Sequence, residues 1–426
     1  MAATTERWQG SCPPARAMRF DALVLNASLR QSLVTVRSLG RRGLRVAAAG
    51  TERTLPALAS RWCGRRLVFG PPPDEASGDY LDKIREWIDE TGARTLIPSH
   101  DGTIALLREH RSQLEPRVRL ALANEPALAV AVNKQRTQVW AKRLGIPVPR
   151  EAVVRTVDDL PAALKEIGLP AVVKPSESWL GTGQEAVRVA PVLVVTATEA
   201  RRAVEQVTRF EEPVLFQQLL SGRREAVSFL YSNGQMYARF AQWAVRTHPP
   251  LGGNSVLRQS IAIPRDTGRH AEALVRDLDL EGYSEVEFRR DADGTPYLME
   301  INPRLSASVE VAVRAGVDFP YLLYQWASGA PIEQQNGYRI GGWMRYLGGD
   351  IEATVDCLQQ RGRPGISRPV KTIVDFGVTF LKPMGYDYFD WRDPLPAVRA
   401  TSGFIRTTFK RLGSRMRKAV LGKAAL

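Results

Sequence analysis

Cysteine and histidine are scarce in this sequence, which argues against two kinds of site. The three cysteines, Cys12, Cys63 and Cys357, are far apart and odd in number, so they fit neither a disulfide framework nor a zinc site. None of the four histidines is spaced as a metal pair, so histidine-based catalysis has little support. No run approaches about eighteen apolar residues, so no transmembrane helix is expected. We therefore expect a cytoplasmic protein with incidental thiols.

Acidic residues are missing from the C-terminal segment, where basic residues accumulate. The chain has a formal net charge of +14, and residues 401–426 contain seven lysines and arginines and no acid. This segment alone supplies half of the excess charge. The overall charge therefore does not indicate a nucleic-acid-binding surface, and no nucleic acid is expected as a partner.

Apolar residues in the same segment recur at helical spacing. They are Ile405, Phe409, Leu412, Met416 and Val420, with the basic residues elsewhere on the wheel. The pattern predicts a cationic amphipathic helix. Two interpretations stay open. Residues 402–426 lie peripherally on the anionic inner surface of a membrane, or the apolar stripe packs on the body of the protein or on a second subunit.

The N-terminal part predicts an α/β layer. Residues 1–18 lack the apolar centre of a signal peptide and are expected to form a disordered leader, with Met18 as an alternative start. Strands are predicted at 20–27, 44–50 and 93–98 and a helix at 32–39. This order predicts a parallel, doubly wound sheet. No GxGxxG follows the first strand, so a Rossmann-type dinucleotide site is not indicated. Asp101, after the third strand, either faces a ligand or caps the next helix.

The segment SEVEFRRDADGTPYLMEINPRLSAS (284–308) contains the strongest candidate site. Alternation predicts strands at Ser284–Arg289 and Pro296–Ile301, joined by a turn. Residues two apart on a strand point to the same face, and the hairpin can bring Glu287 beside Glu300 and Asn302. Oxygen ligands on one face suit Mg²⁺, especially when nucleotide phosphates complete its shell. The alternative is a half-buried hairpin whose charged face is merely solvated.

Three earlier elements favour a nucleotide site. Lys134 begins a predicted helix that ends in GIPVP, and Lys174 ends a predicted strand just before SESWLGTG. Two lysines can neutralise a polyphosphate, and a loop with Gly181 and Gly183 can bring backbone N–H groups to phosphate oxygens. The third element is Gln217–Leu220, followed by Gly222 and Glu225. Each element alone is more often a solvated surface feature, so the interpretation depends on the set.

The order and spacing of these elements resemble the ATP-grasp superfamily, which includes carbamoyl-phosphate synthetase, biotin carboxylase and D-alanine–D-alanine ligase. The resemblance covers about residues 20–330, and the hairpin ending EINPR is its most specific element. It implies an α/β and α+β multidomain fold, with an N-terminal Rossmann-like parallel α/β layer followed by a two-lobed ATP-grasp domain. The expected divisions are 1–18 (leader), 19–122 (α/β layer), 123–330 (ATP-grasp domain), 331–400 (extension) and 401–426 (basic tail).

The resemblance also implies a role for each matching residue. ATP and Mg²⁺, or Mn²⁺ in its place, would be the cofactors. The phosphates would meet Lys134 and Lys174 and a flap, Ser176–Gly183, that contains Ser176, Gly181 and Gly183. Gln217 and the Leu220 backbone would bind adenine, and Glu225 the ribose. The metal ligands would be Glu287, Glu300 and Asn302, and Arg304 would lie near the γ-phosphate or an acyl phosphate.

The sequence departs from the family pattern at four positions. Asn133 stands where many relatives have Asp, and Gln217 where many have Glu. Two residues separate Gly222 from Glu225 where some relatives have one, which puts the ribose role in doubt. Glu285 stands where D-alanine–D-alanine ligases have an arginine, which argues against that particular member.

The resemblance implies an ATP-dependent carboxylate–amine ligase that works through an acyl phosphate and releases ADP and phosphate. Its partners would be a small-molecule carboxylate and an amine, and a homodimer is a further expectation. Two alternatives stay open: a non-catalytic ATP-binding protein that is regulatory or membrane-associated, and a kinase-like phosphotransferase. Arg246 and Arg258 flank the loop 247–255 and either bind an anionic substrate or the transferring phosphoryl group, or are ordinary surface arginines.

Overall fold

A parallel sheet forms the N-terminal layer of the computed structural model, which describes residues 19–70, 78–175, 179–180, 187–189, 191–209, 213–250 and 252–423. Its strands are β1 (Ala22–Val24), β2 (Val46–Gly50), β3 (Cys63–Val68), β4 (Thr95–Ile97) and β5 (Arg119–Leu120), in the order β3-β2-β1-β4-β5. The helices of the layer are α1 (Arg30–Arg41), α2 (Pro56–Ala59), α3 (Gly78–Thr91), α4 (Asp101–Glu109) and α5 (Arg111–Leu114). All neighbouring strands pair in parallel, so the prediction of a parallel α/β layer is confirmed.

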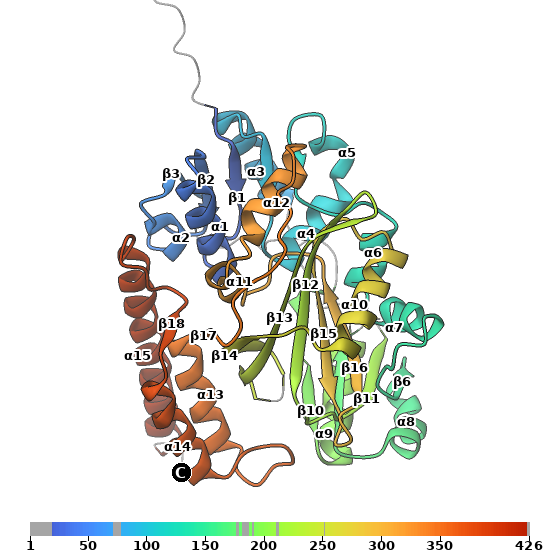
Figure 1. The fold of residues 1–426 in the computed structure, drawn as a ribbon. Coiled ribbons are helices and arrows are strands. Elements are labelled where there is room, and N and C mark those ends of the chain that lie inside the picture. Colours follow the sequence, from blue (N-terminus) through green and yellow to red (C-terminus); the bar gives the residue numbers. More distant parts are fainter. Residues whose placement is uncertain are drawn as a thin grey trace, which may run out of the picture.

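A small lobe follows, at the lower right of Figure 1. It is reached through α6 (Ala127–Val132) and α7 (Lys134–Arg143). Its antiparallel strands are β6 (Glu151–Val154), β7 (Ala171–Pro175), β10 (Val192–Val194) and β11 (Val214–Gln218), in the order β10-β7-β11-β6. Helices α8 (Leu160–Ile167) and α9 (Ala197–Thr208) pack on this sheet around a separate apolar core. The strands β8 (Trp179–Leu180) and β9 (Val187–Arg188) form a short ribbon.

A larger sheet with the strand order β16-β15-β12-β13-β14-β17-β18 crosses the middle of the molecule (Figure 1). Its strands are β12 (Arg224–Ser232), β13 (Gln235–His248), β14 (Asn254–Ile261), β15 (Gly282–Arg290), β16 (Pro296–Asn302), β17 (Trp343–Arg345) and β18 (Met384–Tyr386). Helices α10 (Arg265–Asp277), α11 (Glu310–Ala315) and α12 (Phe319–Ser328) accompany it. Because β17 and β18 come from beyond residue 330, the C-terminal extension completes the same sheet that carries the candidate site.

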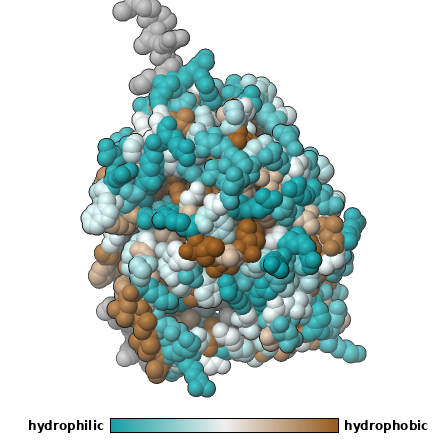
Figure 2. All heavy atoms as spheres, viewed as in Figure 1, coloured by the Kyte–Doolittle hydropathy of each residue, from teal (hydrophilic) through white to brown (hydrophobic). Residues whose placement is uncertain are grey.

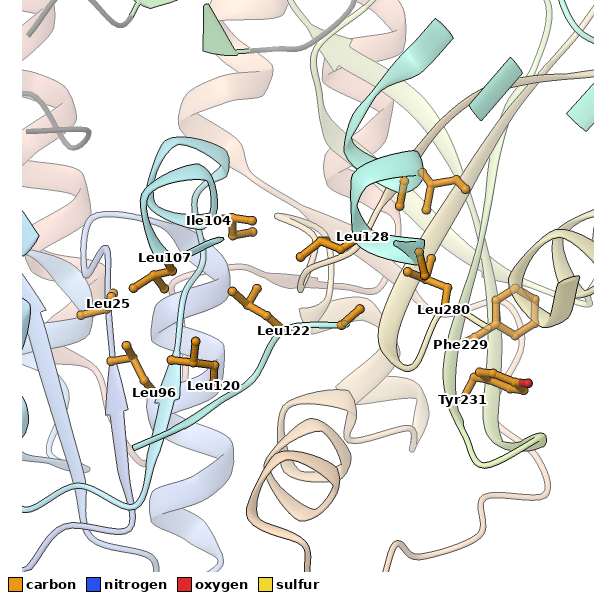
Figure 3. Close-up of a cluster of buried hydrophobic side chains, with 14 of the residues drawn as sticks. Leu25, Leu96, Ile104, Leu107, Leu120, Leu122, Leu128, Phe229, Tyr231 and Leu280 are labelled. Atoms are coloured by element: carbon orange, nitrogen blue, oxygen red, sulfur yellow. The ribbon is translucent and has the colours of Figure 1, made fainter. Parts of the chain in front are cut away.

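One apolar core joins the N-terminal layer to the large sheet. Figure 3 shows leucine and isoleucine side chains of the first layer continuing into side chains of α6 and the large sheet. The labelled residues are Leu25, Leu96, Ile104, Leu107, Leu120, Leu122, Leu128, Phe229, Tyr231 and Leu280. Continuous burial of this kind is the main favourable contribution to folding and holds the two layers at a defined angle.

Buried ion pairs attach the C-terminal extension to both layers. Asp387 accepts hydrogen bonds from Arg30 of α1 (2.6 Å) and from Arg258 of β14 (3.2 Å to Nη1). Asp393 accepts from Arg37 (2.9 Å) and from Ser60 (2.7 Å). Because unpaired charges are costly to bury, these contacts fix where the extension can dock.

The rest of the extension consists of α13 (Leu347–Gln359), α14 (Pro369–Val378), a 3₁₀ turn at Thr379–Leu381 and the long helix α15 (Leu395–Lys423). The predicted C-terminal helix is therefore confirmed. Its first part packs against α2, while Ile405 and Phe409 stay exposed. The side chains beyond residue 410 lie outside the part of the chain that the structure describes. No helix among the described residues is both long and apolar enough to cross a membrane.

Candidate active site

The β15–β16 hairpin brings the predicted metal ligands together. The strands are antiparallel, with Glu287 opposite Glu300 and Glu285 opposite Asn302. The Asn302 amide nitrogen donates to Glu287 Oε1 at 3.1 Å. These side chains share one face of the hairpin, as the period-two pattern predicted. The predicted hairpin geometry is therefore confirmed.

Helix α7 delivers Lys134 to this hairpin. Asn133 caps the helix by accepting from the Arg136 backbone N–H at 2.9 Å, which is the usual role of Asn at an N-cap. The GIPVP segment after the helix joins β16, because the Leu298 N–H donates to the Pro147 carbonyl at 2.9 Å. As a result, Lys134 Nζ lies 3.7 Å from Glu300 Oε2.

The second predicted lysine reaches the site from the small lobe. Lys174 lies at the end of β7 and is buried. Burial lowers its pKa to about 8, although the charge of Glu151 opposes that shift. At pH 7 most of the lysine is still cationic, and an anionic phosphate beside it would favour the charged form. Burial tends to raise the pKa of Glu300, but the charges of Lys134, Arg224 and Lys174 outweigh it, and the pKa is lowered.

The predicted adenine residues lie on the same cavity at the hinge between the lobes. Gln217 of β11 is buried and donates from Nε2 to Glu151 Oε2 at 3.1 Å. Leu220 follows in the connection to β12. Gly222 packs so closely on the Arg290 carbonyl that a Cβ there would collide with it. Only glycine allows the hinge to run along the hairpin in this way.

A cavity of about 210 Å³ connects these residues. Nine of the predicted site residues line it: Lys134, Lys174, Gln217, Leu220, Glu225, Glu287, Glu300, Asn302 and Arg304. Arg304 is oriented by Asp101, whose Oδ2 accepts from Nη2 at 3.0 Å. The predicted flap residues Ser176, Gly181 and Gly183 lie outside the described residues.

Arg246, by contrast, does not line this cavity. Its guanidinium donates to both carboxylate oxygens of Asp350, at 2.6 and 2.7 Å, and faces a neighbouring cavity. Arg258 is fully buried and is paired with Asp387. Their positions on either side of the loop 247–255 suggested either an anion contact or ordinary surface arginines, but tertiary partners hold both of them in ion pairs.

Glu225 lines the cavity, but from the opposite face of its strand to the predicted metal ligands. It lies opposite Phe288 in the β12–β15 ladder, so its side chain belongs to the face that lies away from Glu287. Its carboxylate accepts from Arg290 at 2.9 Å and from Arg223 at 3.0 Å. The sequence has one more residue between Gly222 and Glu225 than some relatives have. Because side chains alternate along a strand, this residue exchanges the two faces of β12 and turns Glu225 away from Glu287.

The same exchange of faces points Arg224 toward the cavity. Arg224 was not among the residues predicted from the sequence. Arg224 Nε donates to Glu287 Oε2 at 2.8 Å. Glu285, on the same face, is buried, and burial raises its pKa. Counting strand parity from Gly222 would have identified Arg224, and the same parity on β15 groups Glu285 with Glu287.

The donor set fits a divalent ion whose shell is completed by phosphates. Burial raises the pKa of Glu287 to about 7, with Arg224 opposing the shift and Glu300 adding to it. A cation placed between these carboxylates would relieve both the burial and the repulsion. Two carboxylates and one amide oxygen are too few for a closed protein cage, and no cluster of three Asp, Glu, His or Cys suited to a metal occurs among the described residues. Such an open set is typical of Mg²⁺ held jointly by protein and nucleotide.

Arg224→Met should strengthen metal binding. The guanidinium competes with a cation for Glu287 Oε2, so its removal leaves the carboxylate free and the site more negative. We expect the affinity for Mn²⁺, measured by electron paramagnetic resonance with ADP present, to rise about tenfold, or ~1.4 kcal/mol. Arg223→Met, one residue away on the outer face, is the matched control and should change little. Unchanged affinity in Arg224→Met would show that the two groups do not compete.

Comparison with known proteins agrees with the fold and with the family that the motifs resemble. Residues 211–341 match the family described as "ATP-grasp in the biosynthetic pathway with Ter operon". The D-alanine–D-alanine ligase of Aromatoleum aromaticum is 30% identical over 216 residues, which are 46% of this chain and 65% of that ligase. The chain thus spans slightly less than two thirds of the length of this curated relative.

Solved structures share the architecture at low identity. The biotin carboxylase domain of Hydrogenobacter thermophilus 2-oxoglutarate carboxylase, solved with MgADP and bicarbonate, has a TM-score of 0.62 at 16% identity and covers 76% of this chain and 74% of that one. N5-carboxyaminoimidazole ribonucleotide synthetase, in its ADP complex, has a TM-score of 0.59 at 14% identity and covers 85% of this chain and 98% of that one. The fold is that of these ATP-grasp structures. The resemblance to the ATP-grasp superfamily that the motifs indicated is confirmed by the family match and by the similarity to the ligase.

Proposed function

We propose that this protein is an ATP-dependent carboxylate–amine ligase that forms a C–N bond and releases ADP and phosphate. The observation that carries the proposal is the meeting of two buried lysines and the Glu287–Glu300–Asn302 set in one cavity between two lobes. The similarity to a D-alanine–D-alanine ligase supports it.

The residues of the cavity have complementary roles in the proposed reaction. Lys134 and Lys174 neutralise the phosphates, and Gln217 with the Leu220 backbone holds the adenine. Arg304, oriented by Asp101, places a guanidinium where charge develops on the transferred phosphoryl group. When bound, Mg²⁺ supplies further charge neutralisation from the Glu287–Glu300–Asn302 face. Phosphoryl transfer needs mainly positioning and charge stabilisation, and the site is built for these.

The chemistry has two balanced steps. A carboxylate oxygen of the first substrate attacks the γ-phosphorus of ATP, which forms an acyl phosphate and releases ADP. The bound ammonium first releases one proton to solvent. The amine nitrogen then attacks the acyl carbon, so that the C–N bond forms, phosphate leaves with the electron pair of the broken C–O bond, and the second proton passes to that phosphate. The buried position of the cavity limits competing hydrolysis by water.

The proposal is tested by ADP release from Mg-ATP with pooled carboxylates and amines. We expect release that needs both substrates and is lost in Lys174→Ala. Release with a carboxylate and hydroxylamine, trapped as a hydroxamate, would identify the acyl phosphate. A phosphoester product would instead identify a kinase-like enzyme. Magnesium-dependent ATP binding without any release would favour a non-catalytic protein.

We also propose that the C-terminal extension contacts an anionic membrane surface from the cytoplasmic side. Helix α14 and the following 3₁₀ turn leave several large apolar side chains exposed, including Val370 (75%) and Leu381 (83%), and α15 adds Phe409 (71%). Figure 2 shows apolar surface at the lower left, in the region of the C-terminal helices. Exposed apolar groups beside an acid-free basic helix suit an interface with anionic lipid. The alternative, in which this helix packs on a second subunit, is disfavoured because two basic helices in a dimer contact would repel each other.

Binding to vesicles is the expected result. The protein should co-sediment with vesicles of phosphatidylglycerol and phosphatidylcholine, and binding should weaken several-fold with phosphatidylcholine alone or at high salt, because screening removes the electrostatic part. Leu381→Ser with Val370→Ser should lower binding strongly. Ile340→Ser, at an exposed apolar residue outside these helices, is the control. Equal binding by all variants, or a concentration-dependent dimer without lipid binding, would contradict the proposal.

A further inference from the structure

One end of the cavity, beyond Glu287, is lined by acceptor groups of β15 and β13, the two strands that flank β12. Glu285 of β15 lies opposite Ser228 of β12, and Gln242 of β13 comes from the next strand. Ser306 and Ser308, in the segment after β16, complete this end. Glu285 is 3% exposed and Gln242 is 5% exposed, yet both line the cavity. The buried carboxylate of Glu285 belongs neither to the predicted phosphate contacts nor to the predicted metal ligands, so it is available for another ligand.

One buried acceptor at this end of the cavity has no hydrogen-bond partner among the described residues. Gln242 Nε2 donates to Glu285 Oε2 at 2.8 Å and to Ser308 Oγ at 2.5 Å. Ser228 Oγ donates to the same carboxylate oxygen at 3.3 Å. The other end of the amide, Gln242 Oε1, is buried and has no hydrogen-bond partner among the described residues. An unsatisfied buried acceptor costs about 1–3 kcal/mol, so a ligand that donates a hydrogen bond there is favoured.

The charge at this end points to a cation. Glu285 and Glu287 are two residues apart on one face of β15. The charge of Arg224 acts on both, and the charge of Arg304 also acts on Glu285. Arg224 hydrogen-bonds Glu287, whereas Glu285 is hydrogen-bonded by the neutral groups of Ser228 and Gln242. Burying a carboxylate in this way costs several kcal/mol, which a paired cation offsets. An anionic group would be repelled.

We propose that Glu285 and Gln242 Oε1 bind the protonated amine of the second substrate. The inference rests on the proposed ligase function and adds the place where the amine docks. Glu285 lies directly across the hairpin from Asn302, so a bound ammonium would be held beside the phosphate-binding face. A primary ammonium offers three N–H donors, enough for the carboxylate, the amide oxygen and one serine hydroxyl. Glu285 is then a specificity-determining residue for the amine and has no part in binding ATP.

The test compares two nucleophiles, ammonium and hydroxylamine, that are small enough to enter any binding site for an amine substrate. At pH 7.5 ammonium is cationic, whereas hydroxylamine is mainly neutral. With the carboxylate found in the ADP-release screen, we expect Glu285→Gln to raise the KM for ammonium at least tenfold more than the KM for hydroxylamine. Glu285→Asp should recover part of the difference, because it keeps the charge. Gln242→Leu, which removes the unsatisfied oxygen, should raise the ammonium KM about threefold.

Controls separate this inference from the proposed function. Glu281→Gln, at an acid beside β15 that does not line the cavity, should behave as the unaltered protein, and thermal unfolding shows whether each variant is folded. Equal KM changes for both nucleophiles, or none, in folded Glu285→Gln and Gln242→Leu would overturn the amine subsite while leaving the ligase proposal intact. If the unaltered protein forms no hydroxamate with any carboxylate, the ligase proposal fails, and the amine subsite fails with it.

Discussion

Glu300→Ala is expected to lower Mg-ATP-dependent ADP release by about 10²–10³-fold, a typical loss when one preorganised electrostatic group is removed. Glu300 faces Glu287 across the hairpin and lies 3.7 Å from Lys134 Nζ. Its removal takes away one of the two carboxylates of the predicted metal set and one ion-pair contact of the lysine. Both effects weaken charge neutralisation at the phosphates. The measurement is the initial rate of ADP formation at saturating ATP.

A matched control and a metal titration make this result specific. Glu272→Ala removes a carboxylate of α10 that pairs with Arg239 at the surface, away from the cavity, and should leave the rate within about twofold, as expected of an exposed ion pair. The Mg²⁺ concentration for half-maximal rate should rise in Glu300→Ala and stay constant in the control. A full rate in Glu300→Ala would refute the assignment of the hairpin as the metal face.

Asp387→Ala is expected to destabilise the protein by about 3–5 kcal/mol, the usual cost of breaking a buried ion pair by removing one partner. Asp387 is paired with Arg30 of the N-terminal layer and with Arg258 of the large sheet, and both arginines are buried. The substitution leaves two guanidiniums without their carboxylate at the junction of three parts of the chain. The predicted observable is a lower urea midpoint of unfolding.

Asp390→Ala tests whether the burial of the Asp387 ion pairs causes the expected loss of stability. Asp390 lies in the same connection and pairs with Arg41, but both side chains are partly exposed. Its removal should change stability by less than ~1 kcal/mol. Arg258 also donates to the Ser308 carbonyl at 3.3 Å, so Asp387→Ala should weaken the amine end of the cavity as well. Equal midpoints for the two variants would show that the buried pairs do not attach the extension.

Local signals predicted the hairpin and the helix that carries Lys134 well. Period-two alternation placed Glu287, Glu300 and Asn302 on one face, and the Asn133 cap with the Gly145 stop delimited α7. These features depend on residues close in sequence, whose backbone geometry is set by local sterics and hydrogen bonds. The order of strands and helices likewise predicted the parallel N-terminal layer.

Arg246 and Glu225 show where local signals fail. The family resemblance implied a ribose contact for Glu225, and Arg246 was a candidate because it flanks the loop 247–255. In the structure Asp350 pairs with Arg246, and Arg290 pairs with Glu225. The partner of Arg246 comes from an element about a hundred residues away, and that of Glu225 from a neighbouring strand of the sheet. A single sequence contains no sign of such pairing. Gln242 was missed because its importance arises from strand register across the sheet, whereas strand parity counted from Gly222 could have identified Arg224.

The sequence by itself determined the ATP-grasp elements, their order and the residues of the predicted phosphate and metal face, because each depends on short motifs with a fixed spacing. Tertiary structure alone decided which charges are left for ligands. Folding pairs Arg246, Arg258 and Glu225 inside the protein, and it leaves the Gln242 oxygen unsatisfied beside the buried Glu285. The physical reason is that the effect of a charge depends on its burial and its partners, and both are set by residues distant in the chain.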